Sequence, residues 1–122
     1  MTGEKEIEDL PVIKISKSDL SSSQKADWRI IKALSFLIYC QKQSILIDRI
    51  LIDENKSLFH IFLADGVEVI APQTGNASIL AASLQIIISR FRIEGKIITK
   101  VDFQFDKPIV VLSNGEELSS NL

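Results

Sequence analysis

The sequence predicts an α+β fold, an antiparallel-dominated β-sheet with two α-helices packed on one face. Two segments carry apolar residues at three- and four-residue spacing, as amphipathic helices do, and several short runs of β-branched and aromatic residues are bounded by turn residues. Their order is strand, helix, three strands, helix and two strands, which is typical of such sheets. With 122 residues, 46% of them hydrophobic and 25% charged, the chain is expected to form one domain around one core.

The first elements lie in the N-terminal third of the chain. Residues 1–9 are polar and acidic and predict a flexible arm, residues 10–15 predict a short strand, and the serine-rich residues 16–23 predict a connector that caps a helix. The helix is expected over residues 24–42, with Trp28 as an anchor at the edge of the core. Its predicted inner side is formed by Ile30, Ile31, Leu34, Leu37 and Ile38.

Three strands are expected next, over residues 45–52, 58–64 and 67–71, and together they predict a meander. The polar residues 53–56 separate the first two. Asp65-Gly66 separates the last two and predicts a two-residue hairpin in which both turn positions have positive φ.

A second helix is expected between a cap at Asn76 or Ser78 and a left-handed glycine cap at Gly95, after Pro72 ends the third strand. Its predicted inner side is formed by Ile79, Leu80, Leu84, Ile87, Ile88 and Phe91.

The C-terminal part of the chain predicts two further strands. Residues 97–105 alternate apolar and polar residues, so this strand is expected to be half buried. Asp106-Lys107-Pro108 breaks the alternation, and residues 109–112 form a short apolar strand. The polar residues 113–122 predict a flexible tail. We find no internal repeat in the sequence.

Composition argues against several classes of function. Fourteen basic and sixteen acidic residues give a net charge of −2, and no Lys/Arg cluster interleaved with aromatics suits nucleic acid. The most apolar run, residues 30–40, is too short to span a bilayer, and a chain with a place outside the cytoplasm would need a further segment to take it there. The single cysteine, Cys40, excludes a disulfide within the chain and is expected to pack as a small hydrophobe.

No motif indicates catalysis, a metal or a cofactor. His60, the only histidine, lies in an apolar strand and is expected to be a paired histidine on a solvated strand face. Two pairs of carboxylates, Asp48 with Asp53 and Asp102 with Asp106, are expected to be solvated or to cap turns. The chain is therefore predicted not to be an enzyme, with no catalytic, metal-binding or cofactor-binding residues.

The segment VDFQFDKPIVVL, residues 101–112, is the unusual feature of the sequence. Its last strand is apolar on both faces, so it lies beside the core. As an outer strand it would offer unpaired N–H and C=O groups to another chain, and as a central strand it would be paired on both sides by the protein itself. The sequence leaves these two arrangements open.

Several segments together resemble the extracytoplasmic β domain of the FtsQ/DivIB cell-division proteins. They are LPVI at 10–13, LADGVEVIAP at 63–72 and EGKIITKVDFQFDKPIVVL at 94–112, in order with the two helices. The resemblance runs from about Leu10 to Leu112, so residues 10–112 are expected to be an FtsQ/DivIB-like β domain. The best match is VDFQFDKPIVVL, which resembles the closing pattern of that family.

The resemblance implies a non-enzymatic divisome scaffold at the extracytoplasmic face of the cell membrane. Its C-terminal edge strand would receive a strand from an FtsB-type partner, with FtsL nearby, and no cofactor is implied. The chain itself is expected to be soluble. The partner-binding residues carried over by motif are Phe105, Lys107, Ile109, Val110, Val111 and Leu112.

The sequence also departs from the family. The cytoplasmic tail, the membrane-spanning helix and the POTRA domain of the family have no counterpart before Leu10, which predicts an excised domain. Gln104 stands where the family usually has arginine, so an ionic contact from that position is in doubt.

Two other functions stay open. One is a small-molecule-binding or enzymatic α+β domain with a pocket between the helices and the sheet, lined by Trp28, Tyr39 and His60. The other is a homodimer formed by pairing of the edge strand with a second copy.

Overall fold

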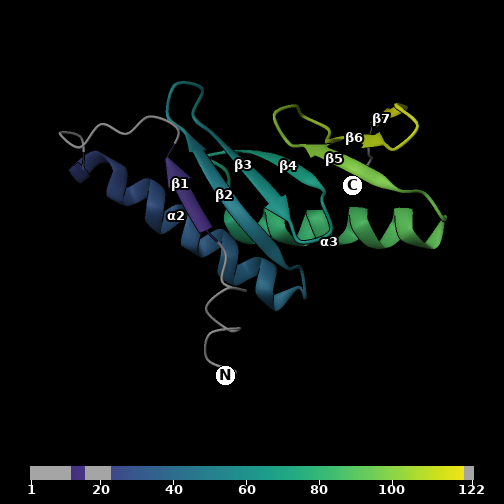
Figure 1. The fold of residues 1–122 in the computed structure, drawn as a ribbon, viewed down its shortest axis with the longest axis horizontal. Coiled ribbons are helices and arrows are strands. Elements are labelled where there is room, and N and C mark those ends of the chain that lie inside the picture. The colour runs from purple at the N-terminus through teal and green to yellow at the C-terminus, as the bar shows by residue number, and fades with distance from the viewer. Residues whose placement is uncertain (1–11, 16–22, 120–122) are drawn as a thin grey trace.

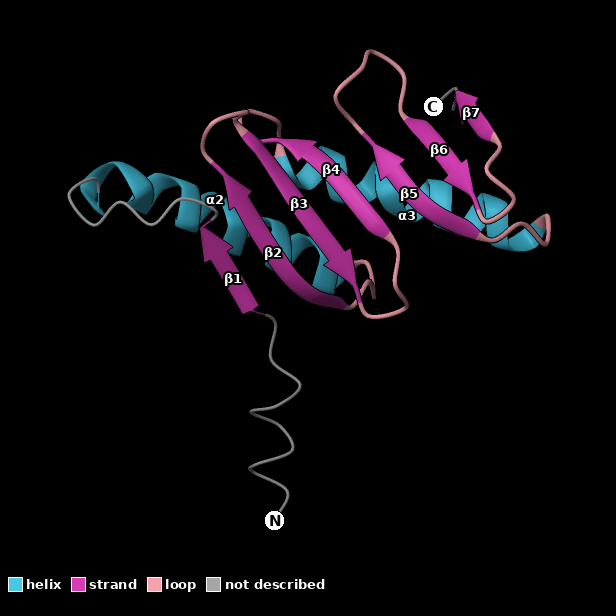
Figure 2. Ribbon diagram, turned by 45° about the horizontal axis from the view of Figure 1, so that its top comes forward, coloured by secondary structure: helices cyan, strands magenta, loops and turns pink. Residues whose placement is uncertain are grey.

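The computed structural model describes residues 12–15 and 23–119, and within them one sheet of seven strands is covered by two helices on one face (Figures 1 and 2). The α+β fold is as predicted. The strands are β1 (Val12–Ile15), β2 (Ile47–Asp53), β3 (Leu58–Leu63), β4 (Glu68–Pro72), β5 (Ile98–Asp102), β6 (Ile109–Leu112) and β7 (Glu117–Ser119); the helices are α2 (Ser23–Lys42) and α3 (Ala77–Ile93).

The strands lie side by side in the order in which they occur in the chain (Figure 2). Most neighbours are antiparallel, and parallel pairs occur where a helix intervenes: β1 beside β2, and β4 beside β5. A parallel pair needs a long crossover, and α2 and α3 provide the two crossovers. The predicted arm, and the N-terminal part of the predicted first strand, lie outside the described residues.

The core lies between the sheet and the two helices. Burying one of its isoleucine, leucine or valine side chains contributes about 1.5–3 kcal/mol. The largest apolar side chains that are essentially without exposed surface come from the strands and from one stripe of each helix, namely Ile50, Ile52, Ile61, Val69, Val101, Val110, Phe36, Cys40, Leu84 and Ile87.

The predicted meander of β2, β3 and β4 is confirmed, but its second turn differs from the prediction. Gly66 has a φ of 98°, whereas Asp65 is not among the residues with positive φ. The amide of Gly66 donates to Leu63 O at 3.0 Å, and the amide of Leu63 donates to Val67 O at 2.8 Å. The loop therefore has three residues and ends in a left-handed glycine, which is the second common hairpin type.

The predicted inner side of α2 is wrong for three of its five residues. Ala33, Phe36 and Cys40 face the core, whereas Ile31 and Ile38 are 63% and 52% exposed. Ile30 and Leu37 pack against the edge of the core, while Leu34 and the predicted anchor Trp28 are largely exposed. The helix carries apolar residues nearly all round, so periodicity could not select a face. The stripe that contains alanine and cysteine allows the closer approach to the sheet.

The prediction for α3 holds better. Asn76 caps the helix by accepting a hydrogen bond from the amide of Ile79 at 3.0 Å, and Gly95 follows the helix with a φ of 75°. Leu84, Ile87 and Phe91 are buried as predicted, whereas Ile79 is 63% exposed. Ile79 lies on the side of α3 that points away from the sheet.

The chain folds as two similar units, although no repeat was found in the sequence. Each unit is a helix, a strand with a bulge near its start, and a second antiparallel strand, given by α2–β2–β3 and α3–β5–β6. The bulges fall between Ile47 and Arg49 and between Ile98 and Lys100.

The connections of the two units match in their hydrogen bonds. After the helices, Ile45 N donates to Cys40 O at 2.8 Å and Lys96 N to Phe91 O at 2.9 Å. At the far ends, Ala64 N donates to Leu46 O and Ser113 N to Ile97 O, both at 2.9 Å. The second unit also ends in the same kind of hairpin, with Gly115 at a φ of 89°. The strands before and after the units, β1, β4 and β7, are therefore equivalent.

Candidate functional site

The apolar strand β6 is an interior strand of the sheet, so the edge position assumed for Ile109–Leu112 is wrong. β6 pairs with β5 on one side and with β7 on the other. The segment predicted as a flexible tail turns back at Asn114-Gly115 and adds β7, because this pair forms the same turn as Asp65-Gly66. The C-terminal edge of the described sheet is therefore β7. This strand pairs with the side of β6 that was predicted to receive a partner strand.

The outer side of β7 has no partner strand among the described residues. The amide of Leu112 donates to Glu116 O at 2.8 Å, and Leu118 lies opposite Val110 two residues further on. Because hydrogen-bonded pairs alternate in an antiparallel ladder, the backbone groups of Leu118 point to β6. Those of Glu117 and Ser119 point outward and can accept another strand.

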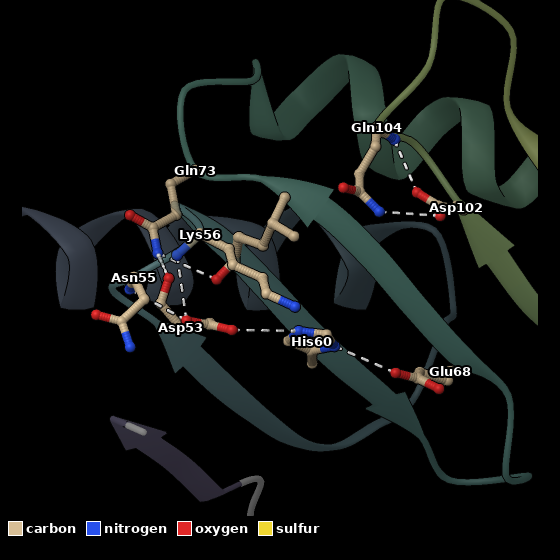
Figure 3. A network of polar contacts seen from close by, with 9 residues as sticks. Asp53, Asn55, Lys56, His60, Glu68, Gln73, Asp102 and Gln104 are labelled. Atoms are coloured by element: carbon tan, nitrogen blue, oxygen red, sulfur yellow. Dashed lines mark hydrogen bonds and ion pairs between the residues drawn. The ribbon is translucent and has the colours of Figure 1, made fainter. Parts of the chain in front are cut away.

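The loop between β5 and β6 lies at one end of this edge, because Ile109 at its close pairs with Ser119. Asp102, which is 9% exposed, begins the loop and accepts hydrogen bonds from the Gln104 amide at 2.9 Å and from Gln104 Nε2 at 3.0 Å (Figure 3). Phe103 turns into the core, whereas Phe105 is 55% exposed. Lys107 is also exposed, so both predicted loop residues are accessible.

The structure brings the six predicted partner-binding residues together only in part. Val110 and Leu112 lie in the core, and their side chains are out of reach of any partner. Ile109 and Val111 alternate with them and point to the face of the sheet that carries no helix, where they are half buried. Only Phe105 and Lys107 have exposed side chains.

Sequence reasoning missed Glu117 and Ser119, the residues with outward backbone groups. The dipeptide Asn114-Gly115 is a hairpin signal that could have predicted the strand containing these residues. The side chain of Asn114 accepts from the Glu116 amide at 2.9 Å, as Asp65 accepts from Val67 at 3.2 Å. The same dipeptide rule that predicted the first hairpin therefore predicts the second.

A second cluster of polar residues surrounds His60 on the helix-free face (Figure 3). Its Nδ1 lies 3.2 Å from Glu68 Oε2 and its Nε2 lies 3.9 Å from Asp53 Oδ2, which confirms the prediction of a paired histidine on a strand face. The carboxylates sit on opposite ring nitrogens and do not converge. Within the described ranges no group of three or more His, Cys, Asp or Glu residues is placed to hold a metal ion.

The carboxylates considered for acid–base chemistry cap turns or face solvent, as predicted. Asp53 accepts from the amides of Asn55 and Lys56, at 3.1 and 3.3 Å, and Asp102 accepts from Gln104. Asp48 pairs with Arg49 at the surface, and Asp106 is exposed. Neither of the two carboxylate pairs forms a site, in agreement with the expectation that they are solvated or cap turns.

The pocket predicted from Trp28, Tyr39 and His60 does not form. Trp28 and Tyr39 are exposed on α2, whereas His60 lies on the opposite face of the sheet, since its neighbours Phe59 and Ile61 point to the helices. Two open hollows of about 260 and 410 Å³ flank the C-terminal half of α3 instead, and they share Asp65, Ile88 and Arg92.

Cys40 is buried against the sheet, and burial raises the pKa of its thiol to about 12. The thiol therefore stays neutral and behaves as a small hydrophobe, as predicted. A neutral buried thiol is not a nucleophile.

No helix in the described part of the chain is both long and apolar enough to cross a membrane. Comparison with models of protein families gives no match, and comparison with curated proteins gives none either.

Proposed function

We propose that the chain is a non-enzymatic binding domain of a cell-division scaffold of the FtsQ/DivIB kind. It acts at the extracytoplasmic face of the cell membrane and receives a strand from an FtsB-type partner, with FtsL nearby. The observation that carries the proposal is the unpaired outer side of β7 among the described residues of an antiparallel-dominated sheet. Strand addition at such an edge obtains affinity from main-chain hydrogen bonds.

The similarity of the two units, α2–β2–β3 and α3–β5–β6, suggests the direction of the incoming strand. β4 is equivalent to β7, and its corresponding side is occupied by β5, which runs parallel to it with Val69 opposite Val101. The amide of Phe103 donates to Ile70 O at 2.8 Å across this pair. Ser119 is equivalent to Ile70, so its carbonyl is the expected acceptor for a partner strand that runs parallel to β7.

The exposed loop between β5 and β6 supplies side-chain contacts in this proposal. Phe105 offers an exposed aromatic ring and Lys107 a positive charge in the loop that leads to Ile109, the residue opposite Ser119. Aromatic residues provide much of the energy at protein interfaces. The amide of Gln104 is engaged by Asp102, so no contact with the partner is assigned to this residue.

The sharpest test is Glu117→Pro. Proline removes an N–H that points away from β6, so it costs the domain no internal ladder bond but denies one to the partner. The matched control, Glu117→Ala, removes the same side chain and keeps the N–H. Binding is measured by calorimetry with a peptide from the FtsB-type protein of the same genome, after circular dichroism shows that both variants fold.

We expect Glu117→Pro to weaken binding about tenfold relative to Glu117→Ala, from the loss of one main-chain hydrogen bond. Phe105→Ala weakens binding as well, whereas Leu46→Ala, at a somewhat more exposed position on another part of the sheet, leaves it unchanged. Equal affinities of the proline and alanine variants would contradict strand addition at β7.

A further inference from the structure

The helices carry most of the large hydrophobic residues that are exposed in the described part of the chain. Of the eleven large hydrophobic residues that are exposed, eight lie on α2 and α3. Single exposed hydrophobics are ordinary, but a set on two neighbouring elements marks a contact surface. The eight are Trp28, Ile31, Leu34, Ile38 and Tyr39 of α2 and Ile79, Ile86 and Ile93 of α3. We call them the outer helix face.

These side chains point away from the sheet. Ile31 and Ile38 are one heptad apart on α2, opposite the buried Ala33 and Phe36. On α3 the same heptad spacing relates Ile79, Ile86 and Ile93, which lie opposite the buried stripe of that helix. Both helices lie on the same side of the sheet (Figure 2), so the two rows face the same direction.

The outer helix face lies in two segments without acidic residues, the first beginning directly after Asp27 and the second ending directly before Glu94. Neither residues 28–42 nor residues 77–93 contain an Asp or a Glu, although the whole chain has sixteen. Of the cations in these segments, Arg29 is partly buried and pairs with Glu54 at 3.8 Å, so the border of the face is formed by Lys32, Lys42, Arg90 and Arg92. The ammonium group of Lys42 lies 5.4 Å from the centre of the Tyr39 ring, at the rim of the face. The surface is therefore apolar with cations at its border, a combination that complements an anionic surface.

The shape and charge of the face select among the anionic partners. The best-formed hollows among the described residues are lined by none of the five isoleucines of the face, so these hollows offer a partner helix no groove that the isoleucines line. A second copy would bring cations against cations. A bilayer needs no groove, accepts tryptophan and tyrosine at its interface, and attracts cations when its lipids are anionic.

We infer that the outer helix face of this domain lies on an anionic lipid bilayer, with its isoleucines in the interface and its lysines and arginines at the headgroups. The helices lie parallel to the membrane and do not cross it. This contact involves other residues than the edge at β7. A failure of the membrane contact would therefore leave the proposal of strand addition untouched, and a failure of strand addition would leave the membrane contact untouched.

The single tryptophan of the chain, Trp28, is part of the face and gives a direct probe. The full chain is mixed with vesicles of phosphatidylglycerol and phosphatidylcholine in equal parts, or of phosphatidylcholine alone, at low salt. We expect co-sedimentation and a blue shift of Trp28 emission with the anionic vesicles only. Lys42→Gln is expected to weaken partition about fivefold, and added salt weakens it further.

A pair of double variants separates the face from nonspecific effects. Ile31→Glu with Ile93→Glu introduces two charges into the face, whereas Leu46→Glu with Ile97→Glu introduces the same charges at comparably exposed positions outside it. We expect the first variant to lose vesicle binding and the second to keep most of it. All four positions are at least 63% exposed, so folding is retained, as circular dichroism checks.

Three results would overturn the inference. The first is equal binding to neutral and anionic vesicles, and the second is equal binding of the two double variants. The third is a shift of Trp28 emission that appears without lipid, either as protein concentration rises or with an acidic amphipathic peptide. That result would assign the face to a second copy or to a protein helix.

Discussion

The two units of the chain, α2–β2–β3 and α3–β5–β6, share their bulge, their helix ends and their hairpin, yet the strands that follow them differ. β4 follows the first unit, pairs on both sides and carries the buried residues Val69, Ile70 and Ala71. β7 follows the second unit, pairs on one side among the described residues and has only Leu118 half buried. The same turn thus produces a core strand in one place and an edge strand in the other, because only β4 is followed by another unit.

The largest difference in stability is expected between variants that carry a charge at equivalent positions of β4 and β7. Val69→Asp buries an unpaired carboxylate, which costs several kcal/mol of a total stability of about 5–15 kcal/mol, so this variant is expected to be unfolded. Leu118→Asp loses only part of a burial worth about 2 kcal/mol and is expected to fold. Thermal unfolding followed by circular dichroism compares them. Similar melting temperatures would contradict the assignment of β7 as an edge strand.

The loops of the two units are held differently, which gives the next prediction. Gln73 is 1% exposed, and its Nε2 donates to Asp53 O and Leu58 O, both at 3.1 Å (Figure 3). Gln73 follows β4, so a residue outside the β2–β3 loop holds the two ends of that loop together. Gln104 holds only its own loop and is exposed. We expect Gln73→Ala to cost about 2 kcal/mol, because two carbonyls lose their partner, and Gln104→Ala to cost less than about 1 kcal/mol. Urea titrations measure both, and equal costs would be the contrary outcome.

The two hairpin glycines give a smaller and more local contrast. Gly66 and Gly115 have positive φ and open space where a Cβ would be placed, so alanine brings backbone strain of about 1–2 kcal/mol at each and no clash. Gly66→Ala is expected to lower the urea midpoint, because its hairpin belongs to the core. Gly115→Ala is expected to leave the midpoint nearly unchanged and to speed hydrogen exchange at the Leu118 amide. A fall of both midpoints by the same amount would show that β7 unfolds together with the core.

The smallest effect concerns Cys40, which takes the place in the first unit that Phe91 takes in the second. The pKa of its thiol is raised by burial to about 12, so the folded state keeps the proton after the unfolded chain has lost it. This stabilisation is complete at neutral pH and is lost as pH rises above the ordinary range of a thiol toward 12. We expect the wild type to lose more stability than Cys40→Ala between pH 8 and pH 11, in urea titrations, and parallel curves would argue against the raised pKa.

Local patterns in the sequence predicted most elements of the fold. Asn76 and Gly95 marked the ends of α3, and Asp65-Gly66 marked a hairpin, since capping and left-handed φ depend on a few adjacent residues. The strand after Asn114-Gly115 was equally predictable from its turn and was missed because the residues that follow are polar. The inner side of α2 was not predictable from periodicity, since a helix that is apolar nearly all round offers more than one stripe.

The sequence by itself determined the class of fold, the positions of the helices and turns, and the pairing of His60 on a strand face, because these depend on residues close together along the chain or on opposite strands of one hairpin. Only the tertiary structure decided that no further described strand lies beyond β7, and that Ile31 and Ile38 face outward. Each of these depends on which segment lies beside which, and the order of strands in a sheet is settled by long-range pairing that leaves little trace in any single segment.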